Sequence, residues 1–533
     1  MPVIIIAIAA ALLLVNLCLE LKRDLMMFQQ NSYRIERYRR WLSESGDSTS
    51  IWRLGGLVVF FIGLSTLSHP YGAAVLAAIF AAAGIWQMLA ARYKKPLVWT
   101  PRAIRIYSTA LALAAALTVA LVFICDHSSA FRVLFTVAMT LLGCYCGSHL
   151  IIAAAGIILQ PLENAINRGY YRDARRILAS MPDLRIIGVT GSYGKTSTKH
   201  FLYKMLARQY DTVMTPGNFN TTLGVIRTIR ENLKPYNEVF IVEMGAKLPG
   251  DIREICELVH PTMGIITAVG PQHLESFKTI ERVQGTKFEL ADTLPADGLV
   301  IVNNDFEKIA DRPVTNTRCA RYTAAGDPTA DYRATDIHYT PAGTTFTIEG
   351  PDGWHLELHT RLMGECNVSD LLAAAIAARA AGVTDDNIRA AVAAIEPVEH
   401  RLSVKTTPGG ITILDDAYNS NPVGSRMALE VLGTFGDRGR RIVITPGMIE
   451  LGAEQHRLNY ELGRTIADNA DIAIIVGRYN REALVGGIKE TPRLPDDAVY
   501  TPDTFAEAQQ ILAGIARKGD TVLYENDLPD TFK

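Results

Sequence analysis

RIIGVTGSYGKTST, at residues 185–198, decides the fold of the second part of this chain. Its first half is rich in isoleucine and valine and predicts a buried strand, and its end predicts a helix from Thr196 onward. Between them, Gly191 and Gly194 predict a turn whose backbone N–H groups can face a phosphate. Lys195 would then reach the β and γ phosphates of a nucleotide, and the Thr196 hydroxyl would bind Mg²⁺. The stretch therefore predicts a phosphate-binding loop.

The pattern is the shorter T-G-x-x-G-K-T form of this loop, because Val189 stands where the strict P-loop pattern has its first glycine. A Gly-x-x-Gly-Lys-Thr string directly after a strand seldom arises by chance. An ordinary strand-to-helix turn is the alternative that the residues leave open.

A chain of 533 residues usually holds about three domains. Hydrophobic residues make up 49% of it, which is high for a soluble protein, and the excess lies before about residue 160. The net charge of −2 gives no reason to expect a basic surface, so we expect no nucleic acid partner. The seven cysteines include no Cys-x-x-Cys pair, which disfavours a zinc site or a disulfide framework and indicates a reducing, cytoplasmic setting.

Five apolar runs occupy this first part, at residues 3–19, 54–67, 72–91, 107–125 and 133–159. Each except the second approaches the roughly 20 residues that cross a bilayer. The second is short and rich in glycine, and we expect it to pair with the third as a hairpin that turns at residues 69–70. A signal peptide is the alternative for the first run, but no positively charged segment precedes it, so we expect a retained helix.

The charges of the loops orient these helices. Residues 20–53 and 92–105 are rich in lysine and arginine, whereas the turns at 68–71 and 126–130 have neither. Under the positive-inside rule the basic loops are cytoplasmic, so five crossings place the N-terminus outside and everything after residue 160 inside. We therefore predict a multi-pass protein of the inner, cytoplasmic membrane whose catalytic domains lie in the cytoplasm.

The basic segment at 20–53 also contains tyrosine and tryptophan, which predicts an interfacial amphipathic helix, with a lipid headgroup site as the alternative. Membrane lipid is accordingly an expected partner. The apolar runs show no obvious buried charge pair, so a transporter is the least favoured interpretation.

Two further strands end near side chains that could bind a metal ion. The string EVFIVEMGA carries Glu243, and in an open α/β sheet the carboxyl ends of the strands face the ligand. Glu243 could therefore hold Mg²⁺ beside the Thr196 hydroxyl, with a solvated strand-end carboxylate as the alternative. His273 follows the strand expected at 263–269, but a single histidine is more often structural than a ligand.

Alternating residues at 331–362 predict antiparallel hairpins beside a parallel core, and a second α/β unit begins near 396–401. Two parallel-sheet domains in tandem leave a cleft that suits a ligand. The expected fold is thus multidomain, with N-terminal transmembrane α-helices followed by an α/β P-loop-type central domain and a C-terminal α/β Rossmann-like domain. The boundaries we expect are 1–160 for about five membrane helices, 161–182 for a linker helix, 183–397 for the central domain and 398–533 for the C-terminal domain.

Seven short strings from about residue 183 onward carry a family resemblance: TGSYGKT, GNFNTTLG, EMGA, GPQHLESF, TKFEL, DDAYNSNP and MIELG. Together they resemble the Mur ligases, ATP-dependent amide-forming enzymes of peptidoglycan precursor synthesis. Within that family they look most like the members that add D-alanyl-D-alanine to UDP-N-acetylmuramoyl-tripeptide. The combination of strings is far more specific than any one of them.

The resemblance implies phosphoryl transfer from ATP to a substrate carboxylate, which gives an acyl phosphate that an amine displaces. Lys195, Lys287 and His273 would be catalytic, and Lys287 would carry a carbamate that binds a second Mg²⁺. The implied metal ligands are Thr196, Glu243, His273 and Lys287. The implied ATP contacts are Gly191, Ser192, Gly194, Lys195, Thr196, Asn367 at the adenine, and Arg401 and Asp416 at the phosphate and ribose. The implied substrate contacts are Asn218, Asn220, Thr221, Tyr418, Asn419 and Asn421.

Three strings depart from the family pattern. Cys366 stands in GECN where the turn usually has histidine, so adenine packing is expected to differ. Thr445-Pro446-Gly447 replaces a Leu-Gly-Asp before the Met-x-Glu-Leu-Gly string, which bears on recognition of the incoming amine. Residues 524–530 replace a Lys-Gly-Ser ending.

The largest departure precedes the phosphate-binding loop, where apolar helices stand in place of the small domain that holds the UDP-sugar in the family. We therefore expect either a lipid-linked muramoyl peptide presented at the membrane or a UDP-linked one bound elsewhere. The second substrate would be an amino acid or a dipeptide, and other wall-synthesis proteins are candidate partners. A membrane-associated polyglutamate-type ligase and a non-catalytic nucleotide-binding scaffold are the alternative functions.

Overall fold

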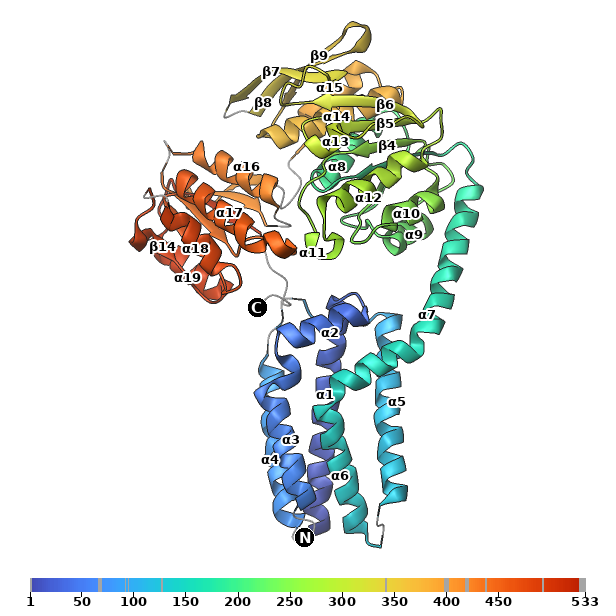
Figure 1. Cartoon of the computed structure of the whole chain (residues 1–533), viewed down its shortest axis with the longest axis vertical. Helices are drawn as coiled ribbons and strands as arrows, with labels where there is room; N and C mark the ends of the chain where they lie inside the picture. Colours follow the sequence, from blue (N-terminus) through green and yellow to red (C-terminus); the bar gives the residue numbers. More distant parts are fainter. Residues whose placement is uncertain are drawn as a thin grey trace. The chain divides into compact units, whose positions relative to one another are not determined.

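The computed structural model describes residues 2–65, 70–91, 93, 95–125, 128–340, 343–396, 402–417, 421–436, 439–490 and 493–526. Within the chain two compact units separate between Arg168 and Gly169. The first unit is helical and the second carries two α/β domains (Figure 1). Each unit has its own hydrophobic cores.

The helical unit contains a bundle around α1. Its elements are α1 (Pro2–Gln30), α2 (Ile35–Glu44), η1 (Asp47–Thr49), α3 (Ile51–Ser65), α4 (Pro70–Ala90), α5 (Pro101–Ile124), α6 (Ala130–Cys146) and the first part of α7 (Ser148–Ala179). Leu13, Leu17 and Leu21 recur at helical spacing on α1 and are buried against the neighbouring helices. Apolar burial along one face of α1 therefore holds the bundle together.

The helices of this bundle run up and down, so its connections fall at two ends (Figure 1). The C-terminal end of α1, helix α2 and the N-terminal ends of α3 and α5 share one end. There the Gln29 side chain donates to the Val98 carbonyl at 2.8 Å and accepts from the Val98 amide at 2.9 Å. Both basic segments of the sequence thus lie at the same end of the bundle.

Five helical segments are long and apolar enough to cross a membrane, namely α1, Asp47–Ser65, α4, α5 and α7, whereas α6 is shorter. The apolar run expected at 133–159 is divided at Gly147 between α6 and α7. Glycine is a weak helix former, and Arg53 Nη1 donates to the freed Cys146 carbonyl at 3.3 Å and to Ser148 Oγ at 2.8 Å. Helix α7 then continues through the boundary expected at residue 160.

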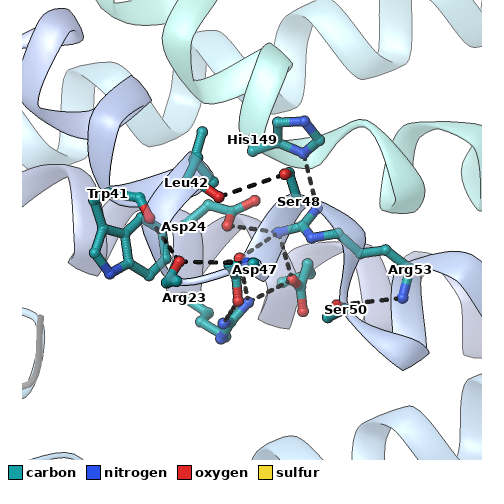
Figure 2. A network of polar contacts seen from close by, with 12 residues as sticks. Arg23, Asp24, Trp41, Leu42, Asp47, Ser48, Ser50, Arg53 and His149 are labelled. Carbon is teal, nitrogen blue, oxygen red and sulfur yellow. Dashed lines mark hydrogen bonds and ion pairs between the residues drawn. The ribbon is translucent and has the colours of Figure 1, made fainter. Parts of the chain in front are cut away.

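Charged side chains form a network inside the helical unit (Figure 2). The guanidinium of Arg53, which is 1% exposed, donates from Nη2 to Glu20 at 2.9 Å and to Asp24 at 2.8 Å. Asp47 accepts from the same Nη2 at 3.4 Å and from Arg23 Nη1 at 3.2 Å. The expectation that no charge pair lies buried among the apolar helices is therefore wrong. The charged residues of the network come from α1, η1 and α3, so no single apolar run in the sequence revealed them.

The central domain is a nine-stranded sheet within the residues described, in the order β2-β3-β1-β4-β5-β6-β7-β8-β9. The strands are β1 (Arg185–Thr190), β2 (Thr212–Met214), β3 (Val239–Glu243), β4 (Met263–Ile266), β5 (Leu299–Asn303), β6 (Arg318–Thr323), β7 (Tyr332–Thr340), β8 (Gly343–Gly350) and β9 (Trp354–Thr360). Pairing is parallel from β2 to β7 and antiparallel from β7 to β9. The predicted antiparallel hairpins beside a parallel core are confirmed.

Helices cover both faces of this sheet. They are α8 (Lys195–Leu206), α9 (Thr222–Glu231), α10 (Asp251–Val259), α11 (Leu274–Phe277), α12 (Ile280–Thr293), α13 (Glu307–Ala310), α14 (Glu365–Ala380) and α15 (Asp385–Ala394). One core contains Phe201 of α8 and Leu371 of α14, and the other contains Ile255 of α10 and Phe288 of α12. Helix α8 begins one residue before the expected Thr196.

The C-terminal domain is a six-stranded sheet in the described residues, in the order β10-β11-β15-β12-β13-β14. Its strands are β10 (Ser403–Thr406), β11 (Thr412–Asp416), β12 (Arg441–Thr445), β13 (Ile472–Ile475), β14 (Val499–Tyr500) and β15 (Thr521–Glu525). Its helices are α16 (Pro422–Gly433), α17 (Gln455–Asn469), α18 (Arg481–Glu490) and α19 (Phe505–Ile515). The four strands that the sequence predicted form the parallel core, and the short edge strands β10 and β14 escaped notice because they lack a buried apolar run.

Candidate functional site

The loop between β1 and α8 has the conformation that the sequence predicts for a phosphate cradle. Gly194 has a φ of 76°, in the left-handed region that favours glycine. A Cβ at Gly194 would overlap the Asp370 carboxylate, and one at Gly191 would overlap the Thr267 hydroxyl. The loop therefore needs glycine at both positions, and it delivers Lys195 as the first residue of α8.

Ser192 and Lys195 lie on this loop in different ways. Ser192 is buried, and its hydroxyl donates to the Gly270 carbonyl at 3.1 Å and accepts from the Gly270 amide at 3.1 Å. Lys195 Nζ instead folds over the loop and donates to the Gly191 carbonyl at 2.6 Å and to the Ser192 carbonyl at 3.2 Å. The first anchors the loop, and the second keeps an ammonium group where a polyphosphate would meet it.

Glu243, the last residue of β3, is brought directly to Thr196. Strand β3 pairs with β1 so that Glu243 lies opposite Val189, two residues before the loop glycine Gly191. The Thr196 hydroxyl donates to the Glu243 oxygens at 3.1 and 3.2 Å, and Asn220 Nδ2 donates to the same carboxylate at 3.1 Å. Glu243 and Thr196 are therefore in contact, as predicted, and Asn220 forms a hydrogen bond to the same carboxylate.

Lys199 is a residue of this site that the sequence did not single out. It lies on α8 one turn after Lys195, is fully buried, and its Nζ donates to Glu243 at 2.9 Å and to the Gly217 carbonyl at 2.7 Å. Burial acts to raise the pKa of Glu243, but the charges of Lys199 and Lys195 outweigh it and hold that pKa below its ordinary value. The only advance signal was the spacing of four residues from Lys195 on a helix.

His273 is held by a different carboxylate. Its Nδ1 lies in hydrogen-bond contact with Glu450, which also pairs with Lys247 Nζ at 3.4 Å. Burial lowers the pKa of His273, and the contact with Glu450 opposes that shift. Among the described residues no three His, Cys, Asp or Glu side chains gather closely enough to hold a metal ion. Glu243 and His273 thus have separate partners within the second unit.

Lys287 lies on α12 and is almost fully buried. Burial lowers its pKa well below the ordinary value, and the charge of Lys195 adds to the effect, against Asp251 and Glu289. Its Nζ has no ion-pair partner in the part of the chain that the structure describes. Burial favours the uncharged form of the amine, and only that form can add CO₂ as a nucleophile, which is the reaction that the implied carbamate requires.

The remaining implied nucleotide residues lie on both α/β domains. Asn367 Nδ2 donates to the Met363 carbonyl at 2.7 Å at the start of α14. Asp416 accepts from the Leu402 amide at 3.0 Å, and a Cβ on Gly364 would lie 3.9 Å from the Leu402 side chain. The structure therefore brings the start of α14 close to the segment that Asp416 fixes, and Arg401 lies outside the described residues.

Several implied substrate residues have structural roles here. The Thr221 hydroxyl accepts from the Gly224 amide at 3.3 Å and caps α9, and Asn421 accepts from the Gly424 amide at 2.8 Å and caps α16. The Asn218 carbonyl accepts from the Asn220 amide at 2.8 Å. Tyr418 and Asn419 lie outside the described residues.

The donor set around the loop fits a magnesium nucleotide. The Thr196 hydroxyl and the ionised Glu243 carboxylate are hard oxygen ligands at one position, as Mg²⁺ prefers. The glycine loop and Lys195 fit the phosphates. Lys287 and His273, which the resemblance implies for a second cation, lie close enough for the charge of Lys287 to act on the pKa of His273. The arrangement can bind a polyphosphate and stabilise charge that develops on it.

Comparisons with known proteins match the two α/β domains. The family model described as Mur ligase middle domain matches residues 189–378, and the one described as Mur ligase, glutamate ligase domain matches residues 400–524. The UDP-N-acetylmuramoyl-tripeptide–D-alanyl-D-alanine ligase of Mycobacterium leprae is 30% identical over 373 residues, which cover 64% of this chain and 70% of the relative. The Bacillus subtilis enzyme of the same name is 27% identical over 347 residues, covering 64% of this chain and 72% of that enzyme. The structure of the MurF ligase from Thermotoga maritima in complex with ADP has a TM-score of 0.58 at 26% identity and covers 68% of this chain and 80% of that one.

Proposed function

This chain belongs to the Mur ligase family, and from that premise we propose that it joins D-alanyl-D-alanine to a muramoyl tripeptide. As a member it is an ATP-dependent, ADP-forming ligase of cell-wall precursor synthesis. The observation that carries the proposal is the contact of the Thr196 hydroxyl with Glu243 directly beside the Lys195 loop. The names of its relatives support the choice of substrates.

The proposed reaction has two steps. A carboxylate oxygen of the tripeptide takes the γ-phosphoryl group of ATP, which releases ADP and leaves an acyl phosphate. The amine of the dipeptide then attacks the acyl carbon, phosphate leaves with the electrons of the C–O bond, and the nitrogen loses a proton. Mg²⁺, when bound, supplies the positive charge that offsets the negative charge on the phosphoryl oxygens.

The residues of this chain prepare that reaction. Lys195 is already folded over the loop, so its ammonium needs only to move from carbonyl oxygens to phosphate oxygens. Lys199 and Asn220 hold Glu243 ionised and oriented toward Thr196. Such a site needs little reorganisation when the transition state forms, which is the usual source of electrostatic catalysis.

We also propose that the helical unit lies in the cytoplasmic membrane. The second unit, from Gly169 onward, carries the proposed ATP site and is called the catalytic unit below; we propose that it lies on the inner side. Large apolar side chains are exposed on several helices, including Ile8, Phe61, Ile79, Trp86 and Phe123. Soluble surfaces seldom expose so many, whereas lipid would cover them. Alkaline phosphatase fused before α1 should be active, and green fluorescent protein fused to the C-terminus should fluoresce. The opposite pattern would refute this orientation.

The acceptor is proposed to be a muramoyl tripeptide presented at the membrane, as a lipid-linked or a UDP-linked molecule. The family models begin at residue 189, and what precedes the linker part of α7 is the helical bundle. Phosphate release by the full chain in detergent, measured with both acceptors, decides between them. Turnover of the UDP-linked acceptor at the rate of a soluble family member would exclude a requirement for lipid.

The same assay tests the proposed function itself. Release with D-alanyl-D-alanine as the amine, and its loss in Lys195→Ala, is the expected result. Release that instead requires glutamate would favour a polyglutamate-type ligase. If the wild-type protein binds ADP but releases no phosphate with any amine, the soluble part is a non-catalytic nucleotide-binding scaffold and the proposal fails.

A further inference from the structure

Glu450 connects the C-terminal domain to a residue that the family resemblance makes a metal ligand. It lies in the segment between β12 and α17, and its carboxylate contacts Nδ1 of His273, which follows β4 of the central domain. Within the described residues of the catalytic unit, this is a direct side-chain contact between its two α/β domains. Sequence separation of 177 residues hid it from any local pattern.

The contact is one of several between the Glu450 segment and the turn at His273. The Glu450 carbonyl accepts from the Glu275 amide at 3.3 Å, two residues after His273. A Cβ at Gly452 would lie only 3.2 Å from the same Glu275 nitrogen, so the segment packs flush against this turn. Lys247 Nζ, on the central domain, lies 3.4 Å from Glu450 Oε1. Backbone and side chain of one short segment thus meet the His273 turn together.

The geometry also fixes which nitrogen of His273 is available. Nδ1 is the ring nitrogen in contact with Glu450, and it carries the proton when the carboxylate accepts this hydrogen bond. Nε2 is then left with its lone pair, which is the form of histidine that binds a metal ion. Histidine ligands commonly donate their other N–H to a carboxylate in this way, and that partner sets the orientation of the ring.

Both residues hold unusual backbone conformations. His273 has a φ of 53° and Glu450 a φ of 61°, in the left-handed region that residues other than glycine seldom adopt. Strained backbone of this kind persists only where the surroundings impose it, and it gathers at functional sites. Here the two strained residues face each other across the contact.

We propose that Glu450 is a positioning residue, which holds the His273 ring ready for a divalent cation only while the C-terminal domain is docked. Docking and cation binding at His273 are then coupled, and each favours the other by the same factor. The cation held by Thr196 and Glu243 involves the central domain alone and is independent of Glu450. This inference rests on the proposed function, because it assigns His273 to a metal site.

Mn²⁺ binding to the full chain in detergent, followed by electron paramagnetic resonance with ADP present, tests the coupling. The class of Mn²⁺ lost in His273→Ala defines the site in question. Glu450→Ala should weaken that class by roughly 10- to 100-fold, as loss of a carboxylate behind a histidine ligand usually does. The double variant should bind no more weakly than His273→Ala alone, and the class that depends on Glu243 should be unchanged.

Lys247→Met is the matched control, because it removes another partner of the Glu450 carboxylate and leaves His273 in place. If Glu450 only tethers the domains, Lys247→Met and Glu450→Ala should weaken the His273 class alike, and the proposal is wrong. It is equally wrong if Glu450→Ala binds Mn²⁺ like the wild type, or if the wild type has no His273-dependent class. Should circular dichroism show Glu450→Ala to be unfolded, Glu450→Leu, which also lacks a hydrogen-bond acceptor, takes its place and must weaken the class too.

Failure of this inference and failure of the proposed function give different results. A wild-type chain that releases phosphate normally while its Mn²⁺ binding ignores Glu450 overturns the inference alone. A wild-type chain without ATP-dependent phosphate release overturns the proposed function, whatever Glu450 does to Mn²⁺.

Discussion

Replacing Arg53 with methionine should destabilise the helical unit severely. Arg53 and Arg23 face three carboxylates, those of Glu20, Asp24 and Asp47, so the formal charge of the network is −1. The substitution keeps an apolar stem but leaves Arg23 alone among the three, at −2. None of the three carboxylates is more than 9% exposed, so water replaces little of the lost attraction.

The expected cost is about 3–5 kcal/mol in the free energy of unfolding, the usual effect of removing one partner from a buried ion pair. A Coulomb estimate supports this size, because two charges about 4 Å apart attract by about 4 kcal/mol at an effective dielectric constant of about 20. Removing Arg53 also removes the desolvation cost of burying its guanidinium. That gain offsets part of the attraction to Glu20 and Asp24 that is lost. The population of the opened unit should therefore rise by roughly 150- to 4,000-fold.

Alkylation of Cys146 measures this population. Its thiol is buried, and its Sγ lies 3.7 Å from the Arg53 carbonyl, so it reacts only when the unit opens. Pulses of maleimide on the detergent-solubilised full chain, read by mass spectrometry, follow the open form when opening is fast relative to labelling. Cys125 is exposed and serves as the internal standard for the reagent.

Two controls separate charge from packing. Arg23→Met removes a guanidinium that is 24% exposed, so its effect should be smaller. Arg53→Met combined with Asp24→Leu restores the formal charge of −1 and should recover part of the loss, since apolar replacement of both partners of a buried pair is often tolerated. Labelling of Cys146 in Arg53→Met at the wild-type rate would refute the reasoning.

Three further predictions concern the catalytic unit. Lys199→Met should raise the pKa of Glu243, because burial already raises it and the charge of Lys199 no longer opposes that effect. The ionised carboxylate supports stability and activity above its pKa, and this support is lost as the pH falls through that pKa. Phosphate release measured across the acidic range should therefore fail at a higher pH in the variant than in the wild type. Lys287→Ala should abolish phosphate release, and CO₂-free buffer should slow the wild type until bicarbonate is added, because burial favours the neutral amine that adds CO₂. Gly194→Ala should abolish ADP binding in calorimetry and cost about 1–3 kcal/mol of stability, because its Cβ would overlap Asp370 at a left-handed φ; unchanged binding would contradict the assigned loop.

The sequence predicted what depends on neighbours along the chain. The strand, glycine turn and helix around Lys195 follow from local pattern, and so does the position of Glu243 at the end of a strand. Their contact follows too, because β1 and β3 are parallel neighbours whose carboxyl ends meet at one edge. Because neighbouring parallel strands end at the same edge of the sheet, the sequence alone was enough to predict that the loop, Thr196 and Glu243 lie together.

What escaped prediction depends on contacts between distant segments. Lys199 looked like any lysine on a helix until the fold buried it against Glu243. Glu450 lies in the MIELG string, which does not show its partner, because that partner, His273, lies in the other α/β domain. Arg53 is charged and short of partners in its own apolar helix, and its carboxylates come from α1 and η1. The residue pattern of one segment does not show which charged side chains of a distant segment will contact it in the fold.

The network around Arg53 also bears on where a phosphate-bearing acceptor could bind. Ser148 Oγ donates to Asp24 at 2.5 Å, and His149 Nδ1, 3.0 Å from Arg53 Nη1, can only accept from a guanidinium and so adds no positive charge there. With three carboxylates against two guanidiniums, the network has no spare cation for a phosphate, although it contains two arginines. An anionic headgroup would have to displace a buried carboxylate, which the surrounding apolar helices disfavour. The network therefore fixes α1, α3 and the break before α7 and is poorly suited to recognise a phosphate, which we expect the lysine-bearing loop of the catalytic unit to bind.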